Sequence, residues 1–349
     1  MTHKTDIQWA TDSANVYRYE KGGWHCVKVS EGCRNCYAER LNMRFGYGGA
    51  NGRPYRVDSR QHLGNVTLNE KMLNGWRTSK QPRRIFVNSM TDTFLETIPD
   101  EMIFRLFSAM AESPRQMFYV LTKRAERMAT VIEDWLDLCG YEAVPNNIMC
   151  GVSIESQKVV EDRLYWLSRV PGLRFISAEP LLAPTSLHAH LADIHQVILG
   201  GESGTGARAM HPGYAGIIHQ ETQYHHVPFF FKQWGAWWPL RELVEYHGLP
   251  DNALAYAGFG FVNVEGKFLR RAEAFGGRYA AAQREPITHE GRYEDNFYED
   301  FTLMVKPTKE QKPAQATLNG VVYNEYSPLH RAMEEALPKV PATSRQIRR

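Results

Sequence analysis

Three of the five cysteines, Cys26, Cys33 and Cys36, lie within eleven residues in the pattern C-x6-C-x2-C. Gly32 directly precedes the second cysteine, where a tight backbone turn would let several sulfur atoms converge. Thiols that converge in this way are metal ligands or disulfide partners. Because no fourth cysteine lies nearby, the pattern indicates a site with one open coordination position. An iron–sulfur cluster with a free iron and a catalytic zinc both fit that description.

A closed zinc site is one alternative for the same cysteines. His25 is adjacent to Cys26 and would complete a Cys3His set, which is a structural arrangement. Neighbouring residues seldom coordinate one metal ion with comfortable geometry, so we favour the cluster. Three cysteines that are simply buried are the least favoured interpretation.

The composition is that of a globular protein in a reducing compartment. A chain of 349 residues with 43% apolar residues is long enough to bury a large core. The net charge of +2 neither demands nor excludes a nucleic-acid partner. The isolated Cys139 and Cys150 argue against a disulfide framework, and neither a signal pattern nor a membrane-spanning apolar run is present. We therefore predict a cytoplasmic protein without a membrane partner, whose oligomeric state is open.

Short strands rich in Val, Ile and Phe alternate with amphipathic helices from residue 84 onward. Strands are expected at 84–89, 116–122, 148–154, 174–177, 196–201 and 227–234, with a further short one at 6–9. Helices are expected at 99–110, 125–138, 158–170 and 214–224. This alternation predicts an α/β fold, a full or partial (β/α) barrel of about six to seven parallel strands. A doubly wound sheet is the alternative.

The alternation stops after Trp238. We predict a barrel domain at 1–238, with the cysteine loop near its N-terminus, and a C-terminal accessory region of unknown role at 239–349. A hairpin is expected at 262–269.

The predicted strands end in unusually polar residues. In parallel α/β folds the ligand binds at the carboxyl ends of the strands, so these residues would converge on one mouth. Asp92 alone is better explained as a helix cap. The argument for a functional site is that polar residues recur at the ends of successive strands. Lys123 is the best candidate for an anion contact. The predicted cofactor-binding residues are Ser89, Asp92, Lys123, Ser153, Glu155, Glu179, Glu202 and Lys232.

Three cysteines in a short loop ahead of a barrel resemble the radical S-adenosylmethionine (radical SAM) superfamily, whose common spacing is C-x3-C-x2-C. The strand ends at 88–92, 122–123 and 151–154 are similar to its spore photoproduct lyase-like branch. A larger set of motifs looks closer still to a phage-associated protein family of unknown function, over roughly residues 5–238. These motifs lie at 6–9, 32–39, 179–182, 200–204 and 231–235.

The resemblance implies an enzyme in which Cys26, Cys33 and Cys36 bind a [4Fe-4S] cluster. The iron without a cysteine takes the amino and carboxylate groups of S-adenosylmethionine. One electron from the cluster then cleaves that cofactor to methionine and a 5′-deoxyadenosyl radical, which abstracts a hydrogen atom from the substrate. An external donor supplies the electron.

Motif position implies roles for four of the strand-end residues. Ser89 and Asp92 would lie near the methionine or ribose, Lys123 would pair with the methionine carboxylate, and Ser153 would approach the ribose. A nucleotide or a nucleic-acid base, for repair or modification, is the substrate class suggested by this branch. The residues that act on the substrate are unknown.

A second class of function is a nucleic-acid-binding protein whose iron–sulfur or zinc site is structural. Trp234, Trp237 and Trp238 would then stack on bases, with Lys232 and Arg241 nearby. The same tryptophans would otherwise pack the barrel floor or the domain junction.

Overall fold

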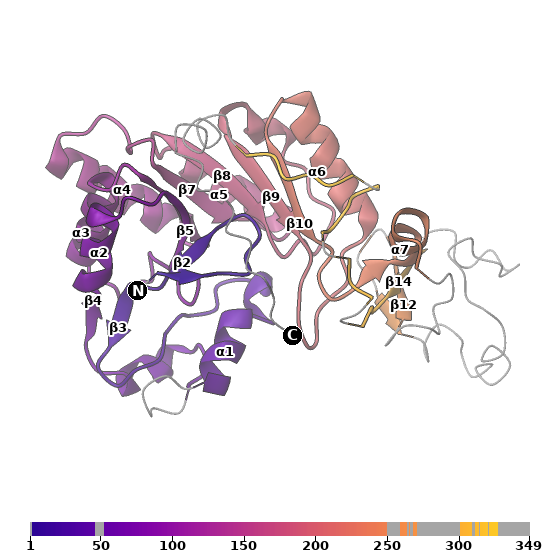
Figure 1. The fold of residues 1–349 in the computed structure, drawn as a ribbon, viewed down its shortest axis with the longest axis horizontal. Coiled ribbons are helices and arrows are strands. Elements are labelled where there is room, and N and C mark those ends of the chain that lie inside the picture. The colour runs from indigo at the N-terminus through magenta and orange to yellow at the C-terminus, as the bar shows by residue number, and fades with distance from the viewer. Residues whose placement is uncertain are drawn as a thin grey trace, which may run out of the picture.

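The computed structural model describes residues 2–45, 52–249, 259–263, 265, 268–270, 301–308, 311–313, 315–319 and 321–326. Its centre is an eight-stranded sheet in the order β1-β2-β5-β6-β7-β8-β9-β10 (Figure 1). β1 runs antiparallel to β2 and every later neighbour pair is parallel, so seven of the eight strands are mutually parallel. The strands are β1 (His3–Lys4), β2 (Asp12–Ala14), β5 (Arg83–Val87), β6 (Gln116–Thr122), β7 (Ile148–Ser153), β8 (Leu173–Ala178), β9 (Gln196–Gly200) and β10 (Phe229–Gln233).

The predicted α/β fold is confirmed, and the barrel is partial. The strand order follows the chain without the reversal that defines a doubly wound sheet. Within the described part of the chain, β1 and β10 do not pair, so the curled sheet stays open. An α-helix follows each of β5, β6, β7 and β9, as expected for right-handed βα units, whereas β8 is followed by a short 3-10 helix at His188–Asp193. These α-helices are α3 (Asp100–Ala111), α4 (Ala125–Cys139), α5 (Val160–Ser168) and α6 (Pro212–Tyr224).

Strand residues alternate between two apolar clusters, because successive side chains of a strand point to opposite faces. In β6, Phe118 and Val120 join the large core formed with the helices. Met117 and Tyr119 join a smaller cluster on the other face. The helices therefore cover one face of the sheet, and the other face is the inner wall of the partial barrel.

The strand expected at 6–9 is wrong, because these residues form a turn between β1 and β2. The Ala10 N–H donates to the Ile7 carbonyl oxygen at 3.0 Å, which closes the turn. The turn directs Trp9 into the inner cluster, where its ring centroid lies 4.8 Å from that of Phe86 and 5.3 Å from that of Tyr119. Burying the indole there determines the local backbone more strongly than strand propensity does.

Smaller elements surround the sheet. On the N-terminal side are α1 (Tyr37–Phe45), α2 (Glu70–Thr78) and a ribbon of β3 (Tyr17–Tyr19) with β4 (Val66–Leu68). After the barrel come α7 (Leu240–His247) and a four-stranded sheet of β11 (Trp238–Pro239), β14 (Phe301–Val305), β12 (Phe259–Asn263) and β13 (Phe268–Arg270). The antiparallel pair β12–β13 confirms the expected hairpin. None of the described helices has the length and apolar character needed to cross a membrane.

Part of the predicted accessory region packs against the barrel. The Phe231 N–H donates to the Tyr323 carbonyl oxygen at 2.8 Å, and the Glu325 N–H donates to the Phe229 carbonyl oxygen at 3.2 Å. The segment 321–326 therefore lies along the open edge of β10, as the yellow chain in Figure 1 shows. The domain boundary at residue 238 stays a prediction.

Candidate functional site

A cavity of about 650 Å³ lies at the carboxyl ends of the parallel strands. This volume is in the usual range for sites that bind small molecules, roughly 300–1,000 Å³. All three clustered cysteines line it, and all the predicted strand-end residues except Glu155 do so too. The latter are Ser89, Asp92, Lys123, Ser153, Glu179, Glu202 and Lys232.

The three thiols belong to one loop, residues 26–36, which we call the cysteine loop. Cys26, Cys33 and Cys36 are each partly buried, and none forms a disulfide. A short turn at Glu31–Cys33 places Cys33, and α1 begins directly after Cys36. Burial raises the pKa of Cys26 to about 12 and also raises the pKa of Cys36. Binding of a metal would therefore release thiol protons, which is the usual coupling at cysteine sites.

The donor set of the cavity is three thiols. Among the residues that the structure describes, no three His, Cys, Asp or Glu side chains are already arranged to hold a metal ion. Cysteine thiolates are the usual ligands of iron–sulfur clusters, so the residues present fit such a group by their chemistry. His25 is buried, its Nε2 has no hydrogen-bond partner among the described residues, and it is not one of those that line the cavity. The structure therefore does not support the Cys3His zinc alternative.

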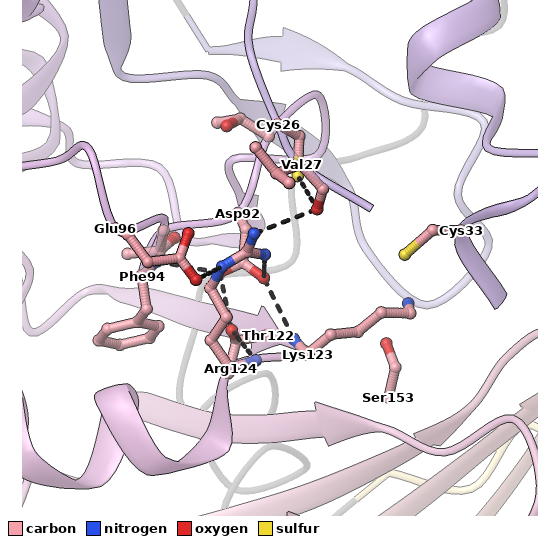
Figure 2. A network of polar contacts seen from close by, with 12 residues as sticks. Cys26, Val27, Cys33, Asp92, Phe94, Glu96, Thr122, Lys123, Arg124 and Ser153 are labelled. Atoms are coloured by element: carbon pink, nitrogen blue, oxygen red, sulfur yellow. Dashed lines mark hydrogen bonds and ion pairs between the residues drawn. The ribbon is translucent and has the colours of Figure 1, made fainter. Parts of the chain in front are cut away.

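Asp92 organises the strand ends with both of its carboxylate oxygens (Figure 2). Oδ1 accepts hydrogen bonds from the Thr122 hydroxyl at 2.7 Å and from the Phe94 N–H at 2.9 Å. Oδ2 accepts from the Lys123 N–H at 3.1 Å and from Arg124 Nη1 at 3.2 Å. Asp92 is buried at the cavity wall, but these four donors already occupy its oxygens. Its contact with a cofactor stays a prediction.

Lys123 presents an ammonium group to the cavity. The side chain extends between Cys33 and Ser153 (Figure 2). Three cationic side chains among the described residues line the cavity, and two are paired. Arg124 binds Asp92, and Lys232 Nζ lies 2.5 Å from Glu179 Oε2. The Lys123 ammonium has no hydrogen-bond or ion-pair partner within the described part of the chain. Its charge does interact with Glu155, whose pKa it lowers, so it lacks a direct contact and not a nearby counter-charge.

Glu155 lies outside the cavity, beneath the cysteine loop. Its carboxylate is fully buried and contacts the Arg163 guanidinium at 2.6 and 3.3 Å. A Cβ atom at Gly32 would come within 3.1 Å of Glu155 Cδ, so the loop backbone rests on this carboxyl group. Burial raises the Glu155 pKa, but Lys123 and Arg163 lower it by more, and the net shift is downward. This placement indicates support of the loop, and the expected contact of Glu155 with a cofactor stays a prediction.

The loop after β9 contacts the second half of the cysteine loop. Asn35 Nδ2 donates to Glu202 Oε2 at 2.9 Å, and Arg208 Nη2 donates to the Glu31 carbonyl oxygen at 3.0 Å. Arg208 also pairs with Glu202 at 2.5 Å. Arg40 donates to two carbonyl oxygens of the same loop, those of residues 203 and 205, at 2.9 and 2.8 Å. Sequence reasoning missed Asn35, Arg40 and Arg208, although the glycine-rich run at 200–206 indicates a close backbone approach.

The tryptophans considered for base stacking are largely internal. Trp234 is 0% exposed and Trp238 is 3% exposed. Trp234 Nε1 donates to the Thr317 carbonyl oxygen, and Trp237 Nε1 donates to the Ala207 carbonyl oxygen, both at 2.9 Å. Buried rings cannot stack on bases, so Trp234 and Trp238 pack the junction between the barrel and the residues that follow it.

The sequence matches the model of a family described as "Protein of unknown function (DUF5131)" over residues 4–327. The chain belongs to this family. No curated protein matches it. The chain resembles solved structures of spore photoproduct lyase, including a complex with dinucleoside spore photoproduct (12% identity, TM-score 0.36) and a mutant (13% identity, TM-score 0.36). Each match covers 64% of this chain and 64% of the enzyme's chain, so more than a third of that enzyme has no counterpart here. This likeness is remote, and the residue roles below rest on the cavity of this chain.

Proposed function

We propose that this chain is a radical SAM-type iron–sulfur enzyme. Cys26, Cys33 and Cys36 would bind a [4Fe-4S] cluster, and Lys123 would bind the carboxylate of S-adenosylmethionine. One observation carries the proposal. Three free thiols of a single loop and an unpaired ammonium line the same cavity, at the carboxyl ends of the parallel strands.

The chain's own residues would bind the cluster, orient the cofactor and exclude water. Three thiolates leave one position of a four-iron cluster without a protein ligand. When bound, the cluster and S-adenosylmethionine supply an electron and a 5′-deoxyadenosyl radical for hydrogen abstraction. The Lys123 ammonium fixes the amino-acid end of the cofactor by a charge-assisted hydrogen bond. Trp9, Phe86 and Leu121 form an apolar wall of the cavity, which keeps water from a reactive intermediate.

Four further cavity residues are proposed to contact the cofactor. The hydroxyl groups of Ser89 and Ser153, which line the cavity, would accept and donate hydrogen bonds at its methionine and ribose ends. The Glu179–Lys232 pair lies at the ends of β8 and β10, lines the same cavity and would supply one acceptor and one donor. We also propose an external electron donor and a reducing, cytoplasmic location in which the thiols stay reduced.

The proposed substrate is a nucleotide or a nucleic-acid base. The support for this class is the resemblance of the strand-end segments 88–92, 122–123 and 151–154 to the spore photoproduct lyase-like branch. The nucleic-acid-binding alternative with a structural metal loses support, because Trp234 and Trp238 are buried and His25 does not line the cavity.

Anaerobic reconstitution with iron and sulfide tests the proposal. The chain should take up about four irons and four sulfides. On reduction it should convert S-adenosylmethionine to 5′-deoxyadenosine, measured by chromatography. Cys33→Ala should abolish cluster binding, whereas Cys139→Ala, which removes an exposed thiol far from the cavity, should leave it unchanged. Zinc without iron in the wild type, or a cluster without cofactor cleavage, would refute the function. Full iron in Cys33→Ala would refute the ligand assignment.

A further inference from the structure

Six residues separate Cys26 from Cys33 in the cysteine loop. The part of the loop around Cys26 and the part with Cys33 and Cys36 are anchored to different segments of the chain. The second half, with Cys33 and Cys36, is hydrogen bonded to the loop after β9 through Asn35 and Arg208. None of those contacts reaches Cys26. A first thiol separated by six residues therefore needs its own anchor if the three sulfur atoms are to serve one cluster.

That anchor is provided by the two carbonyl groups that flank Cys26. The His25 carbonyl oxygen accepts a hydrogen bond from the Thr91 hydroxyl. The Val27 carbonyl oxygen accepts from Arg124 Nη2 at 3.1 Å. The Cys26 thiol also contacts the Val27 carbonyl oxygen, at 3.7 Å (Figure 2). The backbone on both sides of this cysteine is thus bound to residues that follow β5 and β6.

Arg124 uses every arm of its guanidinium group in this arrangement. Nε donates to Glu96 at 2.8 Å, Nη1 to Asp92 at 3.2 Å and Nη2 to Val27 at 3.1 Å. Its side chain is only 5% exposed. A planar guanidinium can reach three acceptors on three chain segments at once, whereas a lysine ammonium is a single point of charge. Arginine is therefore specifically suited to this position.

The same contacts connect Cys26 to Lys123. Asp92 Oδ2 accepts hydrogen bonds from both Arg124 Nη1 and the Lys123 N–H. The Asp92 carboxylate thereby fixes the backbone of Lys123. Through Arg124 it also fixes the backbone next to Cys26. We propose that Arg124, supported by Asp92, is a positioning residue that keeps Cys26 and Lys123 in the relative geometry that the cluster and its cofactor need. This inference rests on the proposed function for the cluster, but the contacts themselves do not.

Alkylation of the metal-free protein tests the anchor directly. Each cysteine is labelled with a thiol reagent and its rate is followed by mass spectrometry, with the exposed Cys139 as an internal standard. Arg124→Lys should increase the labelling rate of Cys26 about tenfold, which corresponds to about 1.4 kcal/mol of easier local opening. Cys33 and Cys36 should change little.

Two matched variants separate positioning from general loss of structure. Arg208→Lys weakens the other anchor and should increase labelling of Cys33 and Cys36 but not of Cys26. Arg127→Lys changes an arginine on the next turn of the chain that binds Asp100 and the Ile98 carbonyl oxygen, and it should alter none of the three rates. If Arg124→Lys does not fold, Thr91→Val removes the other contact and should also increase labelling of Cys26. Equal acceleration of all three cysteines, or no acceleration of Cys26, would overturn the proposal.

The reconstituted protein supplies the second measurement. Arg124→Lys should alter the electron paramagnetic resonance spectrum of the reduced cluster, since the environment of one ligand changes. Faster Cys26 labelling in Arg124→Lys, together with a wild type that takes up no cluster, would retain the anchor and refute the proposed function. A wild type with a cluster and cofactor cleavage, together with unchanged Cys26 labelling and an unchanged spectrum in Arg124→Lys, would retain the function and refute the positioning role.

Discussion

Replacing Glu155 by glutamine isolates the contribution of one buried charge beneath the cysteine loop. Glu155 is 0% exposed and Arg163 is 4% exposed, and their closest N–O distance is 2.6 Å. Arg163 also donates to the Ser153 carbonyl oxygen at 2.7 Å, so it cannot turn toward solvent without losing a second contact. Glutamine has nearly the same shape as glutamate. The substitution therefore removes the negative charge and leaves a buried guanidinium without compensation.

The size of the effect follows from the burial of both partners. Removing one member of a buried ion pair costs about 3–5 kcal/mol, whereas replacing both by apolar residues of similar volume is often close to neutral. We expect Glu155→Gln to lower the free energy of unfolding by about 3 kcal/mol. The double variant Glu155→Leu with Arg163→Met should regain most of that loss. The loop backbone at Gly32 rests on this carboxyl group, so cluster uptake should fall together with stability.

The pH dependence has a definite sign. Burial raises the Glu155 pKa, but Lys123 and Arg163 lower it by more, so the folded-state pKa lies below that of an unfolded glutamate. The stabilisation is thus fully present above the unfolded pKa and is lost as the pH falls through the folded pKa. The stability difference between wild type and Glu155→Gln should be largest near neutral pH and should shrink in acid.

Urea unfolding of the metal-free proteins, followed by tryptophan fluorescence at several pH values, measures this difference. Glu161→Gln is the matched control, since Glu161 contacts His190 on the surface with 80% of its side chain exposed. It should change stability by no more than about 0.5 kcal/mol. A loss below about 1 kcal/mol for Glu155→Gln, the range of surface pairs, would refute the reasoning. A difference that grows on acidification would refute it as well.

Two further predictions concern the cavity and its frame. Lys123→Gln should weaken S-adenosylmethionine binding to the reconstituted enzyme at least about tenfold, as for loss of a hydrogen bond to a charged group, and leave the iron content unchanged. An unchanged dissociation constant would contradict the carboxylate role. Gly201→Ala should destabilise the fold by about 2 kcal/mol or more, because its Cβ would lie 2.0 Å from the Trp234 carbonyl oxygen. Gly216→Ala in α6, where a Cβ meets nothing within 4 Å, should instead stabilise by about 0.5–1 kcal/mol, and equal melting temperatures for the two variants would contradict this account.

The regular helices and strands were predictable because residues that are buried in them form a regular apolar pattern in the sequence. The strand expected at 116–122 is β6 to the residue, since a strand covered on both faces reads as a continuous apolar run. The helices at 99–110 and 125–138 agree with α3 and α4 to within a residue, because their apolar stripes repeat at the helical spacing. The turn at 6–9 could not be found in this way. Its conformation depends on the pocket that receives Trp9, and residues far along the chain build that pocket.

The site was predictable in outline for a related reason. Parallel strands end at the same edge of a sheet, so the polar residues that follow them share one mouth, as the cavity lining shows. Glu155 follows β7 by the same rule, yet it pairs with Arg163 and is not among the residues that line the cavity. The segment 321–326 was likewise assigned to the accessory region, since backbone pairing with the edge of β10 leaves no apolar period to detect.

The sequence by itself determined the alternation of strands and helices, the cysteine loop and the set of polar side chains around the mouth. Only the tertiary structure decided which of those side chains are free. Lys123 and Lys232 both lie at the carboxyl ends of parallel strands, yet Lys232 is ion-paired with Glu179, and no described residue makes a direct ion pair with Lys123. The deciding contacts join segments far apart in the chain, such as Asn35 and Glu202, which are separated by 167 positions. A charge is available for binding only when no partner lies within reach, and that distance is a property of the folded chain.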